Sequence, residues 1–194
     1  MLDLDTILVK ERVGLMKLAD TYDLYDPSTG VSVGICQEAP AWWAHLLRTV
    51  VDKRMLPTRV VVTDTSGETI LDIRRGFTLL FPTIRVLDGR GNQLGSLKAK
   101  FFAIGTSFRV FNVVGNEIAT VKGDWKGWNF KLLSSAGAEL GTITKKWAGL
   151  GKELFTSADN YVISLAPDAT GKSGSRKMLL AAALAIDTCF KENK

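Results

Sequence analysis

Hydrophobic and polar side chains alternate along much of the middle of the chain. Within residues 83–88, Ile84 and Val86 fall on one side of an extended chain and Arg85 on the other, and residues 107–112 follow the same rule. Successive side chains of a strand point to opposite faces. The alternation therefore predicts strands that bury one face and expose the other.

This alternating pattern belongs to a repeated unit. Four copies begin at Arg59, Thr83, Ser107 and Asn129, so the offsets are 24, 24 and 22 residues, and a divergent fifth copy begins at Thr21. Each unit reads as a strand, a turn containing glycine, a second strand and an aromatic link. Glycine supplies the positive φ that tight hairpins need. The repeat predicts an antiparallel meander of hairpins.

Residues 178–186 form an uninterrupted apolar run of nine residues. A membrane-spanning helix needs about 20 such residues. Met, Leu and Ala favour a helix, and a helix that is apolar on all sides is expected inside a protein. A meander hides its edges by closing. We therefore expect a mainly β fold, a closed antiparallel barrel of about twelve strands around this helix, with core residues Met178, Leu179, Leu180, Leu184 and Ile186.

One additional amphipathic helix is predicted over residues 40–54. Pro40 suits a first helical turn. Apolar side chains then recur at helical spacing, at Trp42, Trp43, Leu46, Leu47, Val50 and Val51. We expect this helix to pack against the barrel; the alternative is a helix that dips into a membrane surface.

The composition suits one folded unit. The chain has 194 residues, 46% of them hydrophobic, and shows no linker, so a single domain over residues 1–194 is expected. Acidic Asp3 and Asp5 stand where an export signal would be basic. This favours a cytoplasmic protein, in which Cys36 and Cys189 are reduced thiols.

The residue types that carry enzyme chemistry are sparse. His45 is the sole histidine of the sequence, and residues 89–95 (GRGNQLG) lie between two predicted strands, where they make a hairpin turn rather than a phosphate loop. Asp187 is an acidic residue in the predicted core helix, with Lys177 and Lys191 as candidate partners. We expect no catalytic residue, no cofactor and no metal.

Charge is unevenly distributed. Residues 1–58 contain 6 basic and 8 acidic residues, whereas residues 59–194 contain 19 and 12. The basic part includes a predicted bend, and we expect a lipid-binding site there, composed of Lys145, Lys146, Trp147 and Lys152. Basic residues beside an aromatic one can meet anionic head groups. The alternative is a structural bend in which Trp147 fills the barrel end; nucleic acid is not an expected partner.

Two C-terminal segments carry a family resemblance. GTITKKWAGLGKELFTSADNYVISLAP, followed by KMLLAAALAIDTCFKE, resembles the signature of phospholipid scramblase-related proteins. The N-terminal VKERVGLMKLADTYDLYDP resembles the bacterial branch of this group. The group is similar to LURP-one-related plant proteins and to the Tubby C-terminal domain. The resemblance implies a twelve-stranded barrel around a central C-terminal helix.

The resemblance also bears on function. Eukaryotic scramblases are linked to calcium-dependent lipid movement, and the family's calcium motif falls on residues 157–168. Ser157 stands at an acidic position of that motif and residues 161–166 read as a strand, so we expect no calcium site.

Taken with the filled barrel, this favours a soluble, non-enzymatic binding or scaffold module without transmembrane insertion. It would lie peripheral to a membrane and contact anionic phospholipid or an unidentified protein. The alternative is a phospholipid scramblase or lipid-transfer protein acting at a membrane surface.

Overall fold

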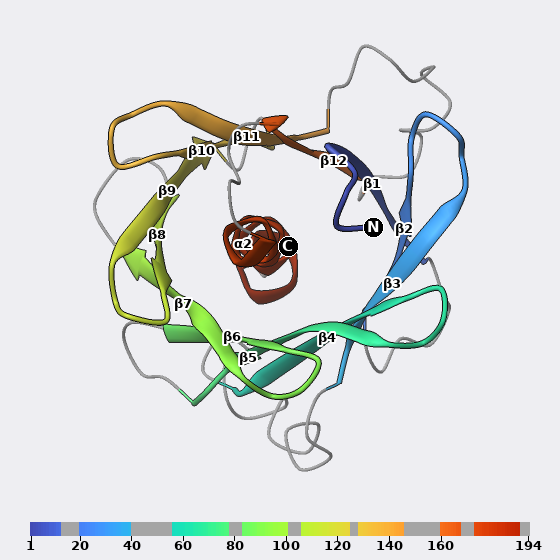
Figure 1. Cartoon of the computed structure of the whole chain (residues 1–194), viewed down its shortest axis with the longest axis horizontal. Coiled ribbons are helices and arrows are strands. Elements are labelled where there is room, and N and C mark those ends of the chain that lie inside the picture. Colours follow the sequence, from blue (N-terminus) through green and yellow to red (C-terminus); the bar gives the residue numbers. More distant parts are fainter. Residues whose placement is uncertain are drawn as a thin grey trace.

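Twelve antiparallel strands close into a ring in the computed structural model of the chain (Figure 1). The structure describes residues 1–12, 20–39, 56–77, 83–100, 106–124, 128–145, 160–167 and 173–190. Within these residues each strand pairs with its neighbours in the sequence, and β1 pairs with β12 to complete the ring. The predicted closed barrel of about twelve strands is confirmed.

The strands are five to eight residues long. Their bounds are β1 Thr6–Glu11, β2 Thr21–Tyr25, β3 Ser32–Glu38, β4 Thr58–Asp64, β5 Thr69–Arg75, β6 Thr83–Asp88, β7 Gln93–Lys100, β8 Thr106–Asn112, β9 Glu117–Asp124, β10 Asn129–Leu133, β11 Glu139–Thr144 and β12 Tyr161–Leu165. The described helix is α2, Ser173–Phe190.

The repeated units are the hairpins β4–β5, β6–β7, β8–β9 and β10–β11. Each turn has a glycine with positive φ, as the sequence predicted, at Gly67, Gly91, Gly115 and Gly137. The residue three positions earlier accepts the amide hydrogen bond of that glycine, for example Asp64 from Gly67 at 3.1 Å. Asp64 also accepts the amides of Ser66 and Glu68 through its side chain. A short polar side chain and a glycine thus specify each turn.

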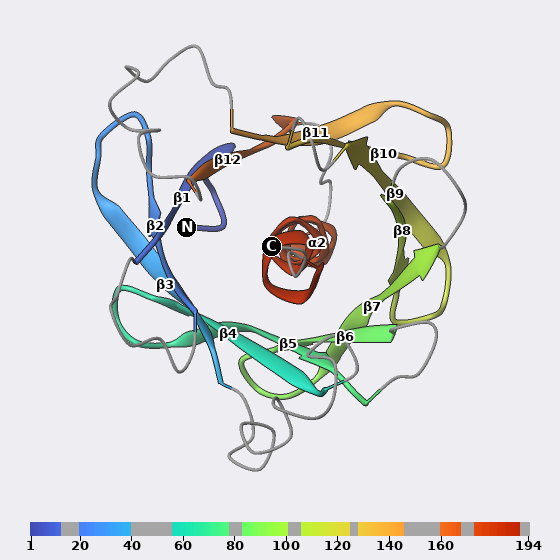
Figure 2. The same ribbon diagram turned by 180° about the vertical axis from the view of Figure 1, so that it is seen from behind.

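Helix α2 lies inside the ring in both views along the barrel (Figures 1 and 2). It contacts β5, β7, β8, β9 and β12. Its side chains from residue 178 to 187 are all exposed by 3% or less, including Met178, Leu179, Leu180, Leu184 and Ile186. The walls supply the other half of the core, with Val60, Ile84, Val110, Val121 and Ile143 among the fully buried side chains. The buried C-terminal helix of the predicted fold is therefore present.

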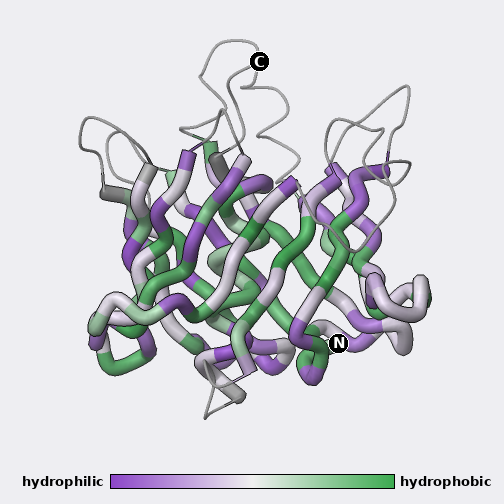
Figure 3. The backbone as a smooth tube through the Cα atoms, turned by 90° about the horizontal axis from the view of Figure 1, so that it is seen from above, coloured by the Kyte–Doolittle hydropathy of each residue, from purple (hydrophilic) through white to green (hydrophobic). Residues whose placement is uncertain are grey.

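The two ends of the barrel differ. We call the end with the five tight turns the hairpin end; the N-terminus lies there, among the turns (Figure 3). The start of α2 is fastened at this end, because the Arg176 guanidinium donates to the Leu4 carbonyl oxygen and, at 2.8 Å, to the Asp5 carboxylate. From the hairpin end, residues 178–187 run along the inside of the barrel. Helix α2 therefore ends at the opposite end of the barrel, which we call the far end. The predicted helix over residues 40–54 lies outside the described residues.

Candidate functional site

Trp128 partly covers the interior at the far end. It immediately precedes β10 and takes a φ of 48°, in the left-handed region that bulky residues seldom adopt. Its ring stacks on Tyr161 (centroids 5.4 Å apart, planes 12° apart) and meets Phe130 edge-on at 5.4 Å. The Lys145 ammonium lies 5.0 Å from the centre of the Trp128 ring. Trp128 thus joins a half-buried cation to the aromatic lining of the barrel.

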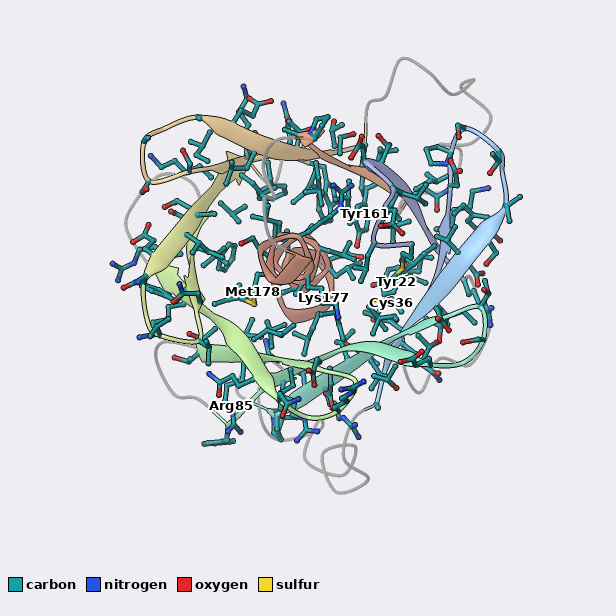
Figure 4. The ribbon with its side chains drawn as sticks, viewed as in Figure 1. Tyr22, Cys36, Arg85, Tyr161, Lys177 and Met178 are labelled. Atoms are coloured by element: carbon teal, nitrogen blue, oxygen red, sulfur yellow. The ribbon has the colours of Figure 1, made fainter. Side chains whose placement is uncertain are left out.

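Near this stack, Asp187 in the last part of α2 lies close to two tyrosines, Tyr22 and Tyr161. Figure 4 shows Tyr22 and Tyr161 inside the ring, together with Cys36. Burial raises the pKa of the Tyr161 phenol well above its ordinary value, and the nearby Asp187 charge raises it further. Burial and Asp187 raise the Tyr22 pKa in the same way. Both phenols therefore stay neutral at any physiological pH.

Asp187 is not paired with Lys177, which the sequence offered as a candidate. Ten residues separate them on α2, which is about 15 Å of helix. Lys177 lies near the hairpin end. There the hydrogen bonds from Asn92 lower the pKa of Asp88, and the Lys177 charge adds to this effect. Lys191 lies outside the described residues.

The predicted lipid-binding residues are only partly described. Strand β11 ends at Thr144, so Lys145 directly follows the strand. The Lys145 amide donates to the Trp128 carbonyl oxygen at 3.4 Å, which holds the two residues opposite each other. Lys146, Trp147 and Lys152 lie outside the described residues. The structure therefore places Lys145 beside Trp128. This contact was not predicted from the sequence.

A second group of cations lies on the outer wall of the barrel. Each of the strands β6 to β10 has a basic side chain described as exposed on the outer face. We call these five residues the basic wall: Arg85, Lys98, Arg109, Lys122 and Lys131. Figure 4 shows Arg85 pointing away from the ring. These residues follow from the same alternation that buries Ile84 and Val110, because each comes directly after a buried, inward-facing apolar residue.

Strand pairing sets cations directly opposite one another on this wall. Lys98 faces Arg109 across β7–β8, and Lys122 faces Lys131 across β9–β10. Like charges directly opposite in a sheet are destabilising. Carboxylates relieve this only in part: Lys131 pairs with Glu139 at 2.7 Å, while Arg109 and Glu117 are 3.8 Å apart. In the described part of the chain, Arg85, Lys98 and Lys122 form no ion pair.

The neighbouring strands show a different arrangement. On β4 and β5, Asp72 lies between Arg59 and Arg74 and receives hydrogen bonds from both guanidiniums. Burial alone would raise the Asp72 pKa, but the hydrogen bonds from Arg74 and Arg59 outweigh it and hold that pKa below its ordinary value. On β4 and β5 one carboxylate thus binds two guanidiniums, whereas on β6 to β9 Arg85, Lys98 and Lys122 form no ion pair with any described residue.

The described residues contain neither a cluster of metal-binding side chains nor a membrane-spanning helix. No three or more His, Cys, Asp or Glu side chains among them are grouped to hold a metal ion. Within the same residues, no helix combines the length and hydropathy that a membrane crossing requires. The calcium motif is only partly described: Asn160 is buried and Tyr161–Leu165 is the predicted strand β12, while residues 157–159 and 168 lie outside.

The comparisons with known proteins give one match. A family model described as Scramblase matches residues 2–193, nearly the whole chain. No curated protein and no solved structure shows significant similarity to the chain. The family is not one of catalytic enzymes. On the length of that match, and in agreement with the resemblance of its C-terminal segments, the chain belongs to the Scramblase family.

Proposed function

We propose that the protein is a non-enzymatic binding module that attaches peripherally to anionic phospholipid surfaces through its basic wall. The observation that carries this proposal is the pairing of Lys98 with Arg109 and of Lys122 with Lys131 on one outer face. Holding like charges opposite each other costs stability. An anionic surface offsets that cost, because each basic residue near it contributes about 1 kcal/mol to attachment.

The interior of the barrel is a poor place for a ligand. Side chains of α2 and of the wall fill it, and Ala183 and Leu184 are fully buried. A lipid head group would have to displace part of this core. We therefore place the lipid contact on the outside and favour attachment over lipid movement through the barrel.

The bend at the far end extends the proposed surface. Lys145 follows β11, the strand next to β10 and its Lys131. With Lys146, Trp147 and Lys152 it forms a second set of candidate lipid contacts. Lys145 is half-buried over Trp128, so we expect the wall to supply more of the attachment than Lys145 does.

Liposome co-sedimentation tests the proposal. The protein should bind vesicles of phosphatidylglycerol at about 10 mM salt, where screening reaches roughly 30 Å, and detach at about 1 M, where it reaches roughly 3 Å. Neutral phosphatidylcholine vesicles should not bind. The double variant Lys98→Gln/Lys122→Gln should weaken binding strongly.

A matched control changes net charge equally on the opposite side of the ring. Ser32→Glu/Gln37→Glu places the change on β3, six strands from β9 in the barrel order (Figure 1). It should bind almost as wild type does. A second comparison, Lys145→Glu/Lys146→Glu/Lys152→Glu, measures the contribution of the bend. Absence of wild-type binding to phosphatidylglycerol at low salt would refute the proposal and leave a protein partner as the remaining interpretation.

A further inference from the structure

Two cations of the basic wall converge on one aromatic ring. Phe111 lies on the outer face of β8, two residues after Arg109. The Lys98 ammonium is 4.9 Å from the centre of its ring, and the Arg109 guanidinium carbon is 5.3 Å from it. The ring attracts each cation weakly and so holds both side chains in place. Their positive ends are thereby brought together rather than spread over the surface.

A hydroxyl group and a third cation lie next to this pair. Ser96 is opposite Phe111 across β7–β8 and opposite Arg85 across β6–β7. Its side chain points outward, because its neighbours Gly95 and Leu97 face the core. Among the described residues, the Ser96 hydroxyl has no hydrogen-bond partner. The patch therefore offers a donor between Arg85 on one side and the Lys98–Arg109 pair on the other.

Glu117 compensates the charge of this patch only in part. Glu117 is 3.8 Å from Arg109, beyond hydrogen-bond length, and it accepts a hydrogen bond of 2.7 Å from the Thr120 hydroxyl. Elsewhere on the wall, Lys131 has Glu139 at 2.7 Å. The Lys98–Arg109 pair is thus the place where two facing cations have the least compensation.

We infer that Ser96, Lys98 and Arg109, with Arg85 beside them, bind a phosphate monoester. A monoester carries close to two negative charges near neutral pH and several terminal oxygens. One such group can neutralise both facing cations, while the guanidinium fork and the Ser96 hydroxyl donate to separate oxygens. A phosphodiester has one negative charge and satisfies the patch less well. If the monoester is a lipid head group, this inference rests on the proposed attachment to anionic lipid. The same chemistry also fits a soluble phosphate monoester.

The test compares two lipids and one soluble probe. Phosphatidic acid presents a monoester and phosphatidylglycerol a diester, so vesicles of each, matched in total surface charge, are used at one salt concentration. Wild type should bind the phosphatidic acid vesicles about tenfold more tightly, as expected when a charge-assisted hydrogen bond is gained. Glycerol 3-phosphate, followed by titration calorimetry, supplies the soluble arm.

Two double variants separate the subsite from general charge. Lys98→Gln/Arg109→Gln should abolish the preference for phosphatidic acid while retaining part of the phosphatidylglycerol binding through Lys122 and Lys131. Lys122→Gln/Lys131→Gln makes the same change in charge and should weaken both lipids while keeping the preference. All four side chains are exposed, and thermal unfolding by circular dichroism checks that each variant is folded.

The outcomes are distinguishable. Equal binding to the two lipids, with no binding of glycerol 3-phosphate, overturns the monoester site but leaves the proposed lipid attachment in place. Binding of glycerol 3-phosphate that is lost in Lys98→Gln/Arg109→Gln, without binding to either vesicle, supports the site with a soluble ligand and overturns the proposed attachment. A preference that survives in Lys98→Gln/Arg109→Gln also overturns the assignment of these residues.

Discussion

At the scale of single residues, Trp128 and Lys145 have positions that the alternation of hydrophobic and polar residues does not predict. Trp128 immediately precedes β10 and has a positive φ, and its ring stacks on Tyr161 and meets Phe130 edge-on. Nothing in the sequence marks a tryptophan for this backbone conformation, since glycine is the residue that usually takes it. Lys145 was predicted as a surface residue, but its position over that ring makes it half-buried.

Asp72 gives a prediction about pH. Its pKa is lowered in the folded state, so the stability it contributes is fully present above its unfolded pKa of about 3.9 and is lost as pH falls through the folded value. We expect Asp72→Asn to reduce the free energy of unfolding by about 1–2 kcal/mol at pH 7, a modest amount because Arg59 and Arg74 are half exposed.

The measurement is urea unfolding of wild type and Asp72→Asn at pH 7 and at pH 3. The two proteins should differ most at pH 7 and less at pH 3, because pH 3 lies below the unfolded pKa of about 3.9, where the contribution of Asp72 begins to be lost. Carboxylates in the turns, such as Asp64 and Asp88, also have lowered pKa values, but they are common to both proteins and cancel in the difference. A constant difference across this pH range would contradict the assignment.

At the scale of elements, β7 approaches α2 closely at Gly95. A Cβ there would lie 2.8 Å from the Met178 Cε atom and would also clash with the Phe111 carbonyl oxygen. The backbone would have to shift because the second contact is main chain. We expect Gly95→Ala to lower the free energy of unfolding by about 1–3 kcal/mol, the usual cost of overpacking.

Gly174, in the first turn of α2, is the matched control. A Cβ added there meets nothing within 4 Å. Because glycine is a poor helix former, Gly174→Ala should be neutral or stabilise by up to about 1 kcal/mol. Urea midpoints of the two variants provide the comparison. Equal destabilisation by both would show that β7 and α2 are not in close contact at Gly95.

The hairpins could be predicted from the sequence, but the register between them could not. The glycine of each turn and the alternation of each strand follow from local chemistry, so the hairpins could be predicted. The facing of Lys98 and Arg109 depends instead on the register between two hairpins, β7 with β8. Each hairpin contains an irregularity, for example between Val86 and Leu87 or Val110 and Phe111, which shifts the pairing by one residue. Register of this kind cannot be read from a single strand, so the facing of Lys98 and Arg109 was not predicted.

At the scale of the whole molecule, α2 and the ring complete one core. Leu180 is exposed by 1% and lies within the buried part of the helix. Leu180→Ala should cost about 2–5 kcal/mol through lost burial and the cavity it leaves. Thermal and urea unfolding measure this loss. A cost below about 0.5 kcal/mol, which is typical of surface positions, would show that the site is not core.

The strongest test of this shared core is removal of the helix. The wall presents fully buried apolar side chains to α2 from all around the ring, including Val60, Ile84, Val110, Val121 and Ile143, and without the helix they would face an empty interior or water. Domains are stable by only about 5–15 kcal/mol, and loss of so much apolar burial exceeds that margin. A chain ending at residue 175 also lacks Arg176, which fastens the helix to the start of β1. We expect this chain to show no cooperative unfolding transition by circular dichroism. Ala182→Asp, which places a charge at a position exposed by 3%, should have a similar effect in the full-length chain, because the carboxylate loses its hydration. A truncated chain that unfolds cooperatively would mean that the ring is stable without α2, and its interior would then be open to a ligand after all.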